Sequence, residues 1–453
     1  METARTWIEP VVAGAQIASS FYDTALLMAV RNHYNKTIDY QQASINSSTD
    51  DVLQKAISNF YIIYNVIMGL TPLLSAYILA KIGDKTSRKV TICVPLLGYL
   101  LSRMFLLFII LWEWPIEVMF GSAALNGLTG WFTTYWAGVM AWASICSSER
   151  RRSLRLVIIE MVYGLAGFVG SLVSGHIFVN LNIANHEGTI LVCCSTGCYA
   201  LCFLYSLFVL RTPEEVNCSE TRPLLNDTDN TMIQAHSVDE STSVSPSKLI
   251  LITMFSSVIL FNISFTAADD VINVFVLKAP LSWGPIEVGY GNAAAYMTYL
   301  TSFLGVFILY RCMGDLAMIV IGIISFSSGL LIMAFVRWTY MYYIARTVMM
   351  FSQIPTPTIR SVISKQIQGS SYGKVFVLLQ LAIEIVAVST SAGFNKLYQA
   401  TLHWYSGFCF IVFGTLGFLC IIPIGIAACN RCSNMDQRDL RSTANPSQIP
   451  EES

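Results

Sequence analysis

Nine ionisable side chains fall deep inside long apolar segments of this sequence. They are Asp23, Arg103, Glu160, His176, Asp269, Asp270, Arg346, Arg360 and Glu384. An ionisable residue at the centre of a membrane helix costs roughly 2.5–3.5 kcal/mol on insertion scales. Such residues are retained mainly where they pair inside a bundle or border a watery pathway. Their chemistry indicates movement of protons and charged solutes.

Glu160 begins a helical face made of small residues. It shares this face with Gly164, Gly167 and Ser171, at spacings of four, three and four residues. Small side chains let a second helix approach closely, so we expect the Glu160 carboxylate to face the protein interior. Desolvation there favours the protonated carboxyl, which predicts a proton-coupling role. A structural carboxylate paired with an arginine is the alternative.

Arg360 follows two prolines, Pro355 and Pro357, inside one apolar segment. Proline removes a backbone donor, so the helix is expected to break there. Broken helices are tolerated at membrane depth where they line a cavity, and a guanidinium suits a carboxylate or phosphate. We predict that Arg360 contacts an anionic substrate. Alternatively, Arg360 and Lys365 mark the inner end of the span.

Two adjacent aspartates, Asp269 and Asp270, lie in one segment. Neighbouring positions are about 100° apart on a helix, so at most one fully faces a pathway. We predict Asp270 as the substrate-binding residue, with interhelical hydrogen bonding as the alternative. Pairing inside a bundle explains four others equally well: Asp23, Arg103, Arg346 and Glu384. We expect His176 to be packed, and most Tyr and Trp residues to be interface anchors, although Tyr299 is a candidate cavity residue.

These residues must be positioned by membrane helices. The chain has 453 residues, of which 54% are apolar and only 12% charged, and the apolar ones form blocks of a length that spans a bilayer. Spans are predicted at 7–30, 56–80, 90–111, 118–146, 156–180, 189–210, 249–277, 288–310, 316–336, 340–366, 375–398 and 405–428. The expected fold is therefore an all-α membrane protein of twelve transmembrane helices in two six-helix bundles.

The predicted organisation has four parts. An N-terminal six-span bundle at 1–210 and a C-terminal bundle at 249–428 flank a polar cytosolic linker at 211–248, and a cytosolic tail follows at 429–453. Lys and Arg are concentrated in alternate loops, which places both termini in the cytosol. Sequons in the first outward loop make Asn35 and Asn46 candidate glycosylation sites. Cys429 and Cys432 are candidates for lipidation.

The turn K-I-G-D-K-T-S-R-K at 81–89 joins the second and third spans. It resembles the cytosolic loop motif of the major facilitator superfamily, in which an acidic and two basic residues latch neighbouring spans. Asp84, Arg88 and Lys89 are the candidate latch, although Ala80 and Ser87 replace two glycines of that motif. A positive-inside stop signal is the alternative.

Enzymatic motifs are absent or misplaced. The run from Gly369 to Gly373 fits G-x-S-x-G, but no strand precedes it, and the sequence contains no H-E-x-x-H motif or Walker loop. We expect no enzymatic activity, metal or cofactor, with protons as the coupling ion. The net charge of −1 gives no support for a nucleic-acid partner.

Long stretches of the membrane portion resemble the proton-coupled folate transporter family, solute carrier family 46 of the major facilitator superfamily. They are ISNFYIIYNVIMGLTPLLSAY at 57–77, AALNGLTG at 123–130, GLAGFVGSLVSGHIF at 164–178, VGYG at 288–291, YLTSFLGV at 299–306 and GSSYGKVFVLLQL at 369–381. The resemblance implies the major facilitator fold, proton coupling through Glu160, and substrate handling by Arg360, Tyr299 and Asp270.

The chain also departs from the folate transporter. Trp131 stands where that transporter has an aspartate, Phe265 replaces a histidine, and Ser282 replaces one cysteine of an outward disulfide. These departures give no support for folate itself as the solute. The resemblance to the family as a whole implies a proton-coupled importer of small anionic organic solutes, similar to antifolates, muropeptides or cyclic dinucleotides, in the plasma membrane or an endosomal membrane. The alternative is a transporter-like receptor or scaffold without turnover.

Replacing Glu160 by Gln removes the proposed proton carrier while preserving side-chain size. We expect Glu160→Gln to abolish acid-stimulated uptake of organic anions and to leave surface expression normal. Uptake measured across a pH series checks this, and an unchanged pH profile in the variant would exclude the role.

Overall fold

The computed structural model describes residues 7–41, 49–85, 87, 89–145, 149–181, 187–210, 248–309, 312–366 and 372–430. Within these ranges the chain is helical and has no β-strand. The first half contains α1 (Glu9–Gln41), α2 (Thr49–Lys85), α3 (Val90–Trp112), α4 (Val118–Leu128), α5 (Trp131–Ile145), α6 (Glu149–Asn180) and α7 (Thr189–Phe208). The second contains α9 (Lys248–Phe275), α10 (Pro285–Leu309), α11 (Asp315–Ala334), α12 (Thr339–Val348), η2 (Met349–Phe351), α13 (Pro355–Gln366), α14 (Tyr372–Thr401) and α15 (Phe408–Leu419).

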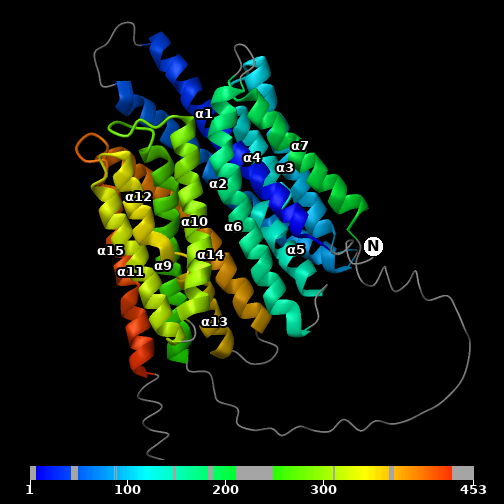
Figure 1. Cartoon of the computed structure of the whole chain (residues 1–453), viewed down its shortest axis with the longest axis vertical. Coiled ribbons are helices and arrows are strands. Elements are labelled where there is room, and N and C mark those ends of the chain that lie inside the picture. Colours follow the sequence, from blue (N-terminus) through cyan, green and yellow to red (C-terminus); the bar gives the residue numbers. More distant parts are fainter. Residues whose placement is uncertain are drawn as a thin grey trace, which may run out of the picture.

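Each of the twelve predicted spans coincides with a helix or a broken helix of the described chain. Eight described helices are long and apolar enough to cross a membrane by themselves. The N-terminal helices gather on one side of the molecule and α9–α15 on the other (Figure 1). Most of the predicted linker and tail lie outside the described residues.

The first two helices, α1 and α2, extend well beyond the apolar segments that predicted them. The first predicted span ends at residue 30, but α1 continues to Gln41, and α2 begins at Thr49 rather than at 56. Hydropathy reports only the part of a helix that lies in lipid, whereas backbone hydrogen bonding continues the helix into polar sequence. The predicted spans are therefore shorter than the helices that contain them.

The tenth span is broken, as its prolines predict. Helix α12 ends at Val348, a 3₁₀ turn follows, and α13 begins at Pro355. A proline is tolerated at the first position of a helix because that backbone N–H would have no intrahelical partner. The break therefore falls just before Pro355, and Arg360 lies in the second turn of α13.

The fourth span is also broken, which was not predicted. Gly130 has a φ of +95° and Trp131 a φ of +44°, so the chain turns through left-handed backbone between α4 and α5. A Cβ atom at Gly130 would lie 2.4 Å from Oγ1 of Thr134 and 2.8 Å from Cδ1 of Leu79. Glycine is therefore required at this turn by conformation and by space.

The two halves meet along two helix pairs, α6 with α10 and α2 with α14. In Figure 1 these four helices lie near the middle of the view. The α6–α10 pair is very close, because a Cβ atom at Gly175 would lie 2.6 Å from Cα of Ile286. A Cβ at Gly289 would lie 2.6 Å from the carbonyl oxygen of Ser171. The close approach predicted for the small-residue face of Glu160 is therefore made by α10.

The α2–α14 pair is joined by polar contacts near the predicted outward end. The Ser58 hydroxyl donates to Oδ1 of Asn395 at 3.3 Å, and Gln399 Nε2 donates to Oδ1 of Asn59 at 2.9 Å. The Lys396 ammonium also donates to Oδ1 of Asn59, at 3.0 Å. Hydrogen bonds thus hold the halves together at this end.

Further contacts between the halves lie at the same end. Lys278, beyond α9, forms a 2.7 Å ion pair with Asp51 of α2. Arg31 of α1 donates to the carbonyl oxygen of Trp283 at 2.7 Å. His176 is exposed, not packed as predicted. Its Nε2 atom lies 2.8 Å from the Tyr290 hydroxyl of the other half.

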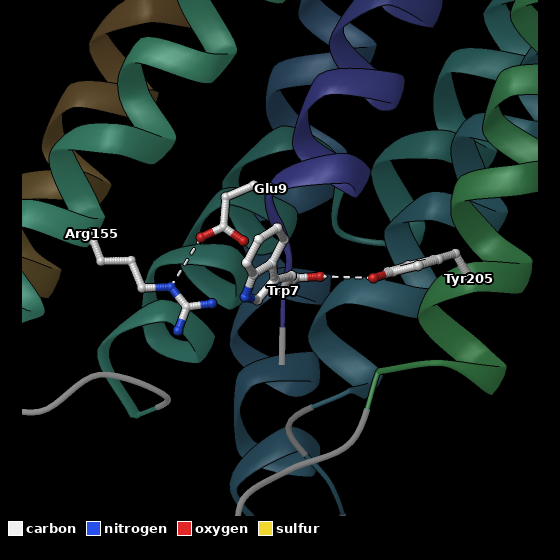
Figure 2. Close-up of polar contacts among 4 residues, drawn as sticks. All are labelled: Trp7, Glu9, Arg155 and Tyr205. Carbon is white, nitrogen blue, oxygen red and sulfur yellow. Dashed lines mark hydrogen bonds and ion pairs between the residues drawn. The ribbon is translucent and has the colours of Figure 1, made fainter. Parts of the chain in front are cut away.

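At the predicted cytosolic end, α1 is attached within its own half (Figure 2). Arg155 Nε forms a 3.0 Å ion pair with Oε1 of Glu9, and the Tyr205 hydroxyl donates to the Trp7 carbonyl oxygen at 3.2 Å. These contacts attach the start of α1 to α6 and α7. The N-terminal half is therefore held as one body.

Trp283, which lies between α9 and α10, provides a test of packing against α12. Its side chain is buried, its ring centroid lies 4.6 Å from that of Tyr342, and its Nε1 donates to Thr339 Oγ1 at 3.0 Å. Trp283→Ala should destabilise the protein by about 3–5 kcal/mol, the usual cost of truncating a buried tryptophan. Thermal unfolding of the purified protein checks this. The matched control is Trp338→Ala, since Trp338 is 57% exposed, and an equal effect of both changes would contradict the assignment.

Candidate functional site

A central cavity of about 520 Å³ lies between the two halves. This volume is within the roughly 300–1,000 Å³ range of small-molecule sites. Side chains of α1, α2, α5 and α6 line one side, and side chains of α9, α10, α12 and α14 line the other. A solute in this cavity would contact both halves at once.

The ionisable residues of the cavity wall are mostly acidic. The lining includes Asp23, Asp269, Asp270, Glu384 and Arg346. All five were singled out from the sequence, although only Asp270 was given a substrate role. Both Asp269 and Asp270 reach the cavity, and Asp269 is the more exposed of the two.

Asp270 joins three helices across the interface. The Asn65 amide on α2 donates to Oδ1 of Asp270 at 3.2 Å and to the Ser391 hydroxyl of α14 at 3.1 Å. The other carboxyl oxygen of Asp270, Oδ2, is buried and has no hydrogen-bond partner. A buried acceptor without a partner is costly.

Arg103 supplies positive charge behind the cavity wall. Its guanidinium lies 3.9 Å from the ring centroid of Tyr22 and 4.8 Å from the centroids of Tyr99 and Tyr199. Its side chain is buried, and its charge attracts that of Asp23. Three aromatic faces and one carboxylate thus stabilise this cation away from water.

Arg346 has the corresponding position in the second half. Its Nε donates to the Tyr342 hydroxyl at 2.9 Å, and its charge attracts that of Asp269. Each half therefore has an aspartate at the cavity that interacts with an arginine, Asp23 in the first half and Asp269 in the second. The bundle pairing considered for these residues from the sequence agrees with this arrangement.

Aromatic rings form much of the remaining wall. Tyr163 of α6 and Tyr296 and Tyr299 of α10 have ring centroids 6.2–6.3 Å apart in each pairing. Gln16 Nε2 donates to the Tyr296 hydroxyl at 2.7 Å. The expectation that most aromatic residues anchor the membrane interface is wrong for the cavity residues. These are Tyr22, Tyr61, Tyr64, Trp131, Tyr163 and Tyr296, whereas Tyr299 lines the cavity as expected.

Glu160 and Arg360 are not among the residues that line this cavity. They come from opposite halves, α6 and α13, and their charges attract each other. Glu160 lies one helical turn before Tyr163, on the side toward the start of α6. Arg360 also attracts Glu384, which does line the cavity. The pair therefore lies next to the cavity on its predicted cytosolic side.

The structure does not test the predicted latch or the predicted glycosylation sites. Asn35 is exposed on α1, whereas Asn46 lies outside the described residues. Lys89 immediately precedes α3, but Arg88 and the side chain of Asp84 also lie outside the described residues. The latch and both glycosylation sites remain predictions.

Comparison with known proteins defines the class. The sequence profile of the Major Facilitator Superfamily matches residues 15–309. The fold and the central cavity are those of a membrane transporter rather than an enzyme, and the chain belongs to the major facilitator superfamily and, within it, to solute carrier family 46. The expectation of two six-helix bundles and the family resemblance are both confirmed.

The relatives share most of their length with this chain. Solute carrier family 46 member 2 of Canis lupus familiaris is 46% identical, over 97% of this chain and 96% of that protein. The Mus musculus protein of the same name is 45% identical, over 94% and 92%. A lysosomal proton-coupled steroid conjugate and bile acid symporter of Gallus gallus is 26% identical, over 96% and 95%.

Solved structures support the same fold. A D-xylose–proton symporter has a TM-score of 0.61 at 12% identity, over 92% of this chain and 96% of that one. The human organic anion transporter MFSD10 has a TM-score of 0.59 at 13% identity, over 93% and 99%. At this level of identity the likeness defines the fold alone.

Removing Arg103 tests how its charge is stabilised. Arg103→Leu should cost roughly 2 kcal/mol or more, because it removes desolvated cation–π contacts and the attraction to Asp23. Asp23→Asn introduced into Arg103→Leu should cost less than Asp23→Asn in the parent protein. A double-mutant cycle of thermal stability measures this coupling. Strictly additive effects would show that the two charges act independently.

Proposed function

We propose that this protein is a proton-coupled symporter that imports anionic organic solutes by alternating access. The observation that supports this most directly is the cavity between the halves, with ionisable groups from both halves on its wall. A pathway residue must be reachable from each side in turn, and a site at the interface of two bundles meets that condition.

Glu160 is the proposed proton carrier, and Arg360 the proposed anion contact. Their charges attract each other in the described state. An anion that binds Arg360 competes with Glu160 for this positive charge, and a carboxylate deprived of its counter-charge takes up a proton more readily. Proton and solute then favour each other's binding, as symport requires.

Tyr299 and Asp270 are proposed to contact the solute within the cavity. Both belong to its wall, and Tyr299 is 39% exposed. Asp270 is also hydrogen-bonded to Asn65 across the interface, so solute binding there would change how the halves are joined.

Access would alternate through changes at the two ends of the bundles. Hydrogen bonds between α2 and α14 join the halves at the predicted outward end. The opposite state requires these contacts to open and the cytosolic ends to approach, where Asp84, Arg88 and Lys89 form the proposed latch. This exchange of contacts corresponds to the rocking motion of transporters with two repeated halves.

The proposed solutes are organic anions similar to antifolates, muropeptides or cyclic dinucleotides, in the plasma membrane or an endosomal membrane. The name of the Gallus gallus relative specifies proton coupling, steroid conjugates and bile acids. That name supports proton coupling and an organic solute for this chain. A lysosomal location is a further proposal from the same name.

Counterflow in proteoliposomes separates transport from binding without turnover. Vesicles preloaded with an unlabelled organic anion should accumulate the labelled anion, and accumulation should rise when the outside is acidified. A receptor or scaffold would bind the anion without exchanging it. Absence of counterflow across a panel of antifolate-, muropeptide- and cyclic-dinucleotide-like anions would contradict the proposal.

Arg360→Ala should lower anion uptake about tenfold or more. Hydrogen bonds to charged groups contribute about 1.5–3 kcal/mol, and 1.4 kcal/mol corresponds to a factor of ten. The matched control is Arg337→Ala, because Arg337 is exposed between α11 and α12. Uptake at fixed pH measures both. Equal effects of the two changes would exclude a specific role for Arg360.

A further inference from the structure

The cavity wall contains more negative than positive groups. Among its residues, four carry carboxyl groups and one, Arg346, carries a guanidinium. Arg103 and Arg360 contribute positive charge from outside the wall, next to Asp23 and Glu384 respectively. Counting these two arginines, four carboxyl groups stand against three guanidinium groups, so carboxyl groups still outnumber the positive groups at the cavity.

Asp23 and Asp269 face the cavity from opposite halves. Both side chains are exposed, both line the cavity, and their charges repel each other. Tyr296 lines the same cavity as both carboxylates. A positive group between α1 and α9 would therefore be attracted by two carboxylates.

The aromatic side chains next to these carboxylates are suited to the same chemistry. Tyr163, Tyr296 and Tyr299 line the same cavity as Asp23 and Asp269, and their ring centroids lie 6.2–6.3 Å apart. Aromatic faces attract ammonium and guanidinium groups, by about 0.5–2 kcal/mol depending on desolvation. Carboxylates and tyrosine rings together form a binding site for an organic cation.

A second observation indicates an unfilled donor position. Asp270 Oδ2 is buried without a hydrogen-bond partner, although Oδ1 of the same carboxyl is hydrogen-bonded to Asn65. An unsatisfied buried acceptor is costly, so a ligand N–H donor that reached this oxygen after a change in side-chain conformation would stabilise the complex.

We propose that the transported solute is zwitterionic: besides its anionic group it bears an ammonium or guanidinium group, which Asp23 and Asp269 hold against Tyr163, Tyr296 and Tyr299. This rests on the proposed function and specifies the chemistry of its solute. A bound cation also removes the repulsion between Asp23 and Asp269. Because these residues belong to different halves, filling the site favours their approach and couples binding to closure.

Charged thiol reagents measure the cavity potential without knowledge of the solute. A cysteine is placed at Ala387, which lines the cavity on α14, in the full chain in membranes. We measure the rates at which this cysteine is modified by a cationic reagent, methanethiosulfonate ethyltrimethylammonium, and by an anionic one, methanethiosulfonate ethylsulfonate. The ratio of the two rates is compared with the ratio for a free thiol in solution. The parent protein gives the background of native cysteines. Ala295→Cys on α10 provides a second reporter if the first impairs folding.

The ratio of the cationic to the anionic modification rate should be at least about tenfold higher for the cavity cysteine than for the free thiol. Clefts lined by one sign of charge concentrate the opposite ion about 10–10³-fold. Asp23→Asn and Asp269→Asn should each lower this preference. Glu287→Gln is the matched control, since Glu287 lies on α10 but does not line the cavity. A ratio equal to that of the free thiol, or one unchanged by both Asp variants, would overturn the proposal.

A matched pair of peptides tests the cationic group itself. Glycylglutamate and N-acetylglycylglutamate share their carboxylates, but only the first has an ammonium. The free peptide should protect the reporter cysteine from N-ethylmaleimide at about tenfold lower concentration, and Asp23→Asn should remove the difference. Equal protection by the two peptides, including none by either, would overturn the proposal. Neither readout requires transport, so failed counterflow is distinguishable from a failure of the cation site.

Discussion

Stabilising charge inside a bilayer is the constraint on which this structure depends. Lipid offers no hydrogen bonds, so each charged group in the spans requires another charge, an aromatic face or water. Asp23 with Arg103 and Asp269 with Arg346 meet this requirement within one half each. Arg360 attracts Glu384 of its own half and also Glu160 of the other half. Attraction between opposite charges thus stabilises each bundle and also acts between the two bundles.

Local sequence features predicted the parts of the fold that local physics determines. Hydropathy identified the twelve spans, Pro355 identified the broken tenth span, and the face from Glu160 to Ser171 identified a close helix contact. Each follows from residues near one another in the chain. The break at Gly130 was not predicted, because it depends on neighbours such as Leu79 on another helix.

The wall of the cavity was predicted only in part, for a similar reason. Ionisable residues such as Asp270 are conspicuous in an apolar helix, so the sequence identified them. For a tyrosine such as Tyr163 or Tyr296, the sequence does not distinguish a ring that faces lipid from one that faces the headgroup region or a cavity. Only the tertiary arrangement assigns these rings to the wall, and it also makes Asp269 the more exposed of the two adjacent aspartates.

The glycines of the α6–α10 pair have a kinetic consequence. Backbone contact at Gly175 and Gly289 involves no rotamers, so a change in tilt between these helices requires no reordering of side chains there. In the proposed cycle, the polar contacts at the predicted outward end, among them those of α2 and α14, must then break. Hydrogen bonds of this kind contribute about 0.5–1.5 kcal/mol each, so a small group of them would contribute to the barrier of that cycle.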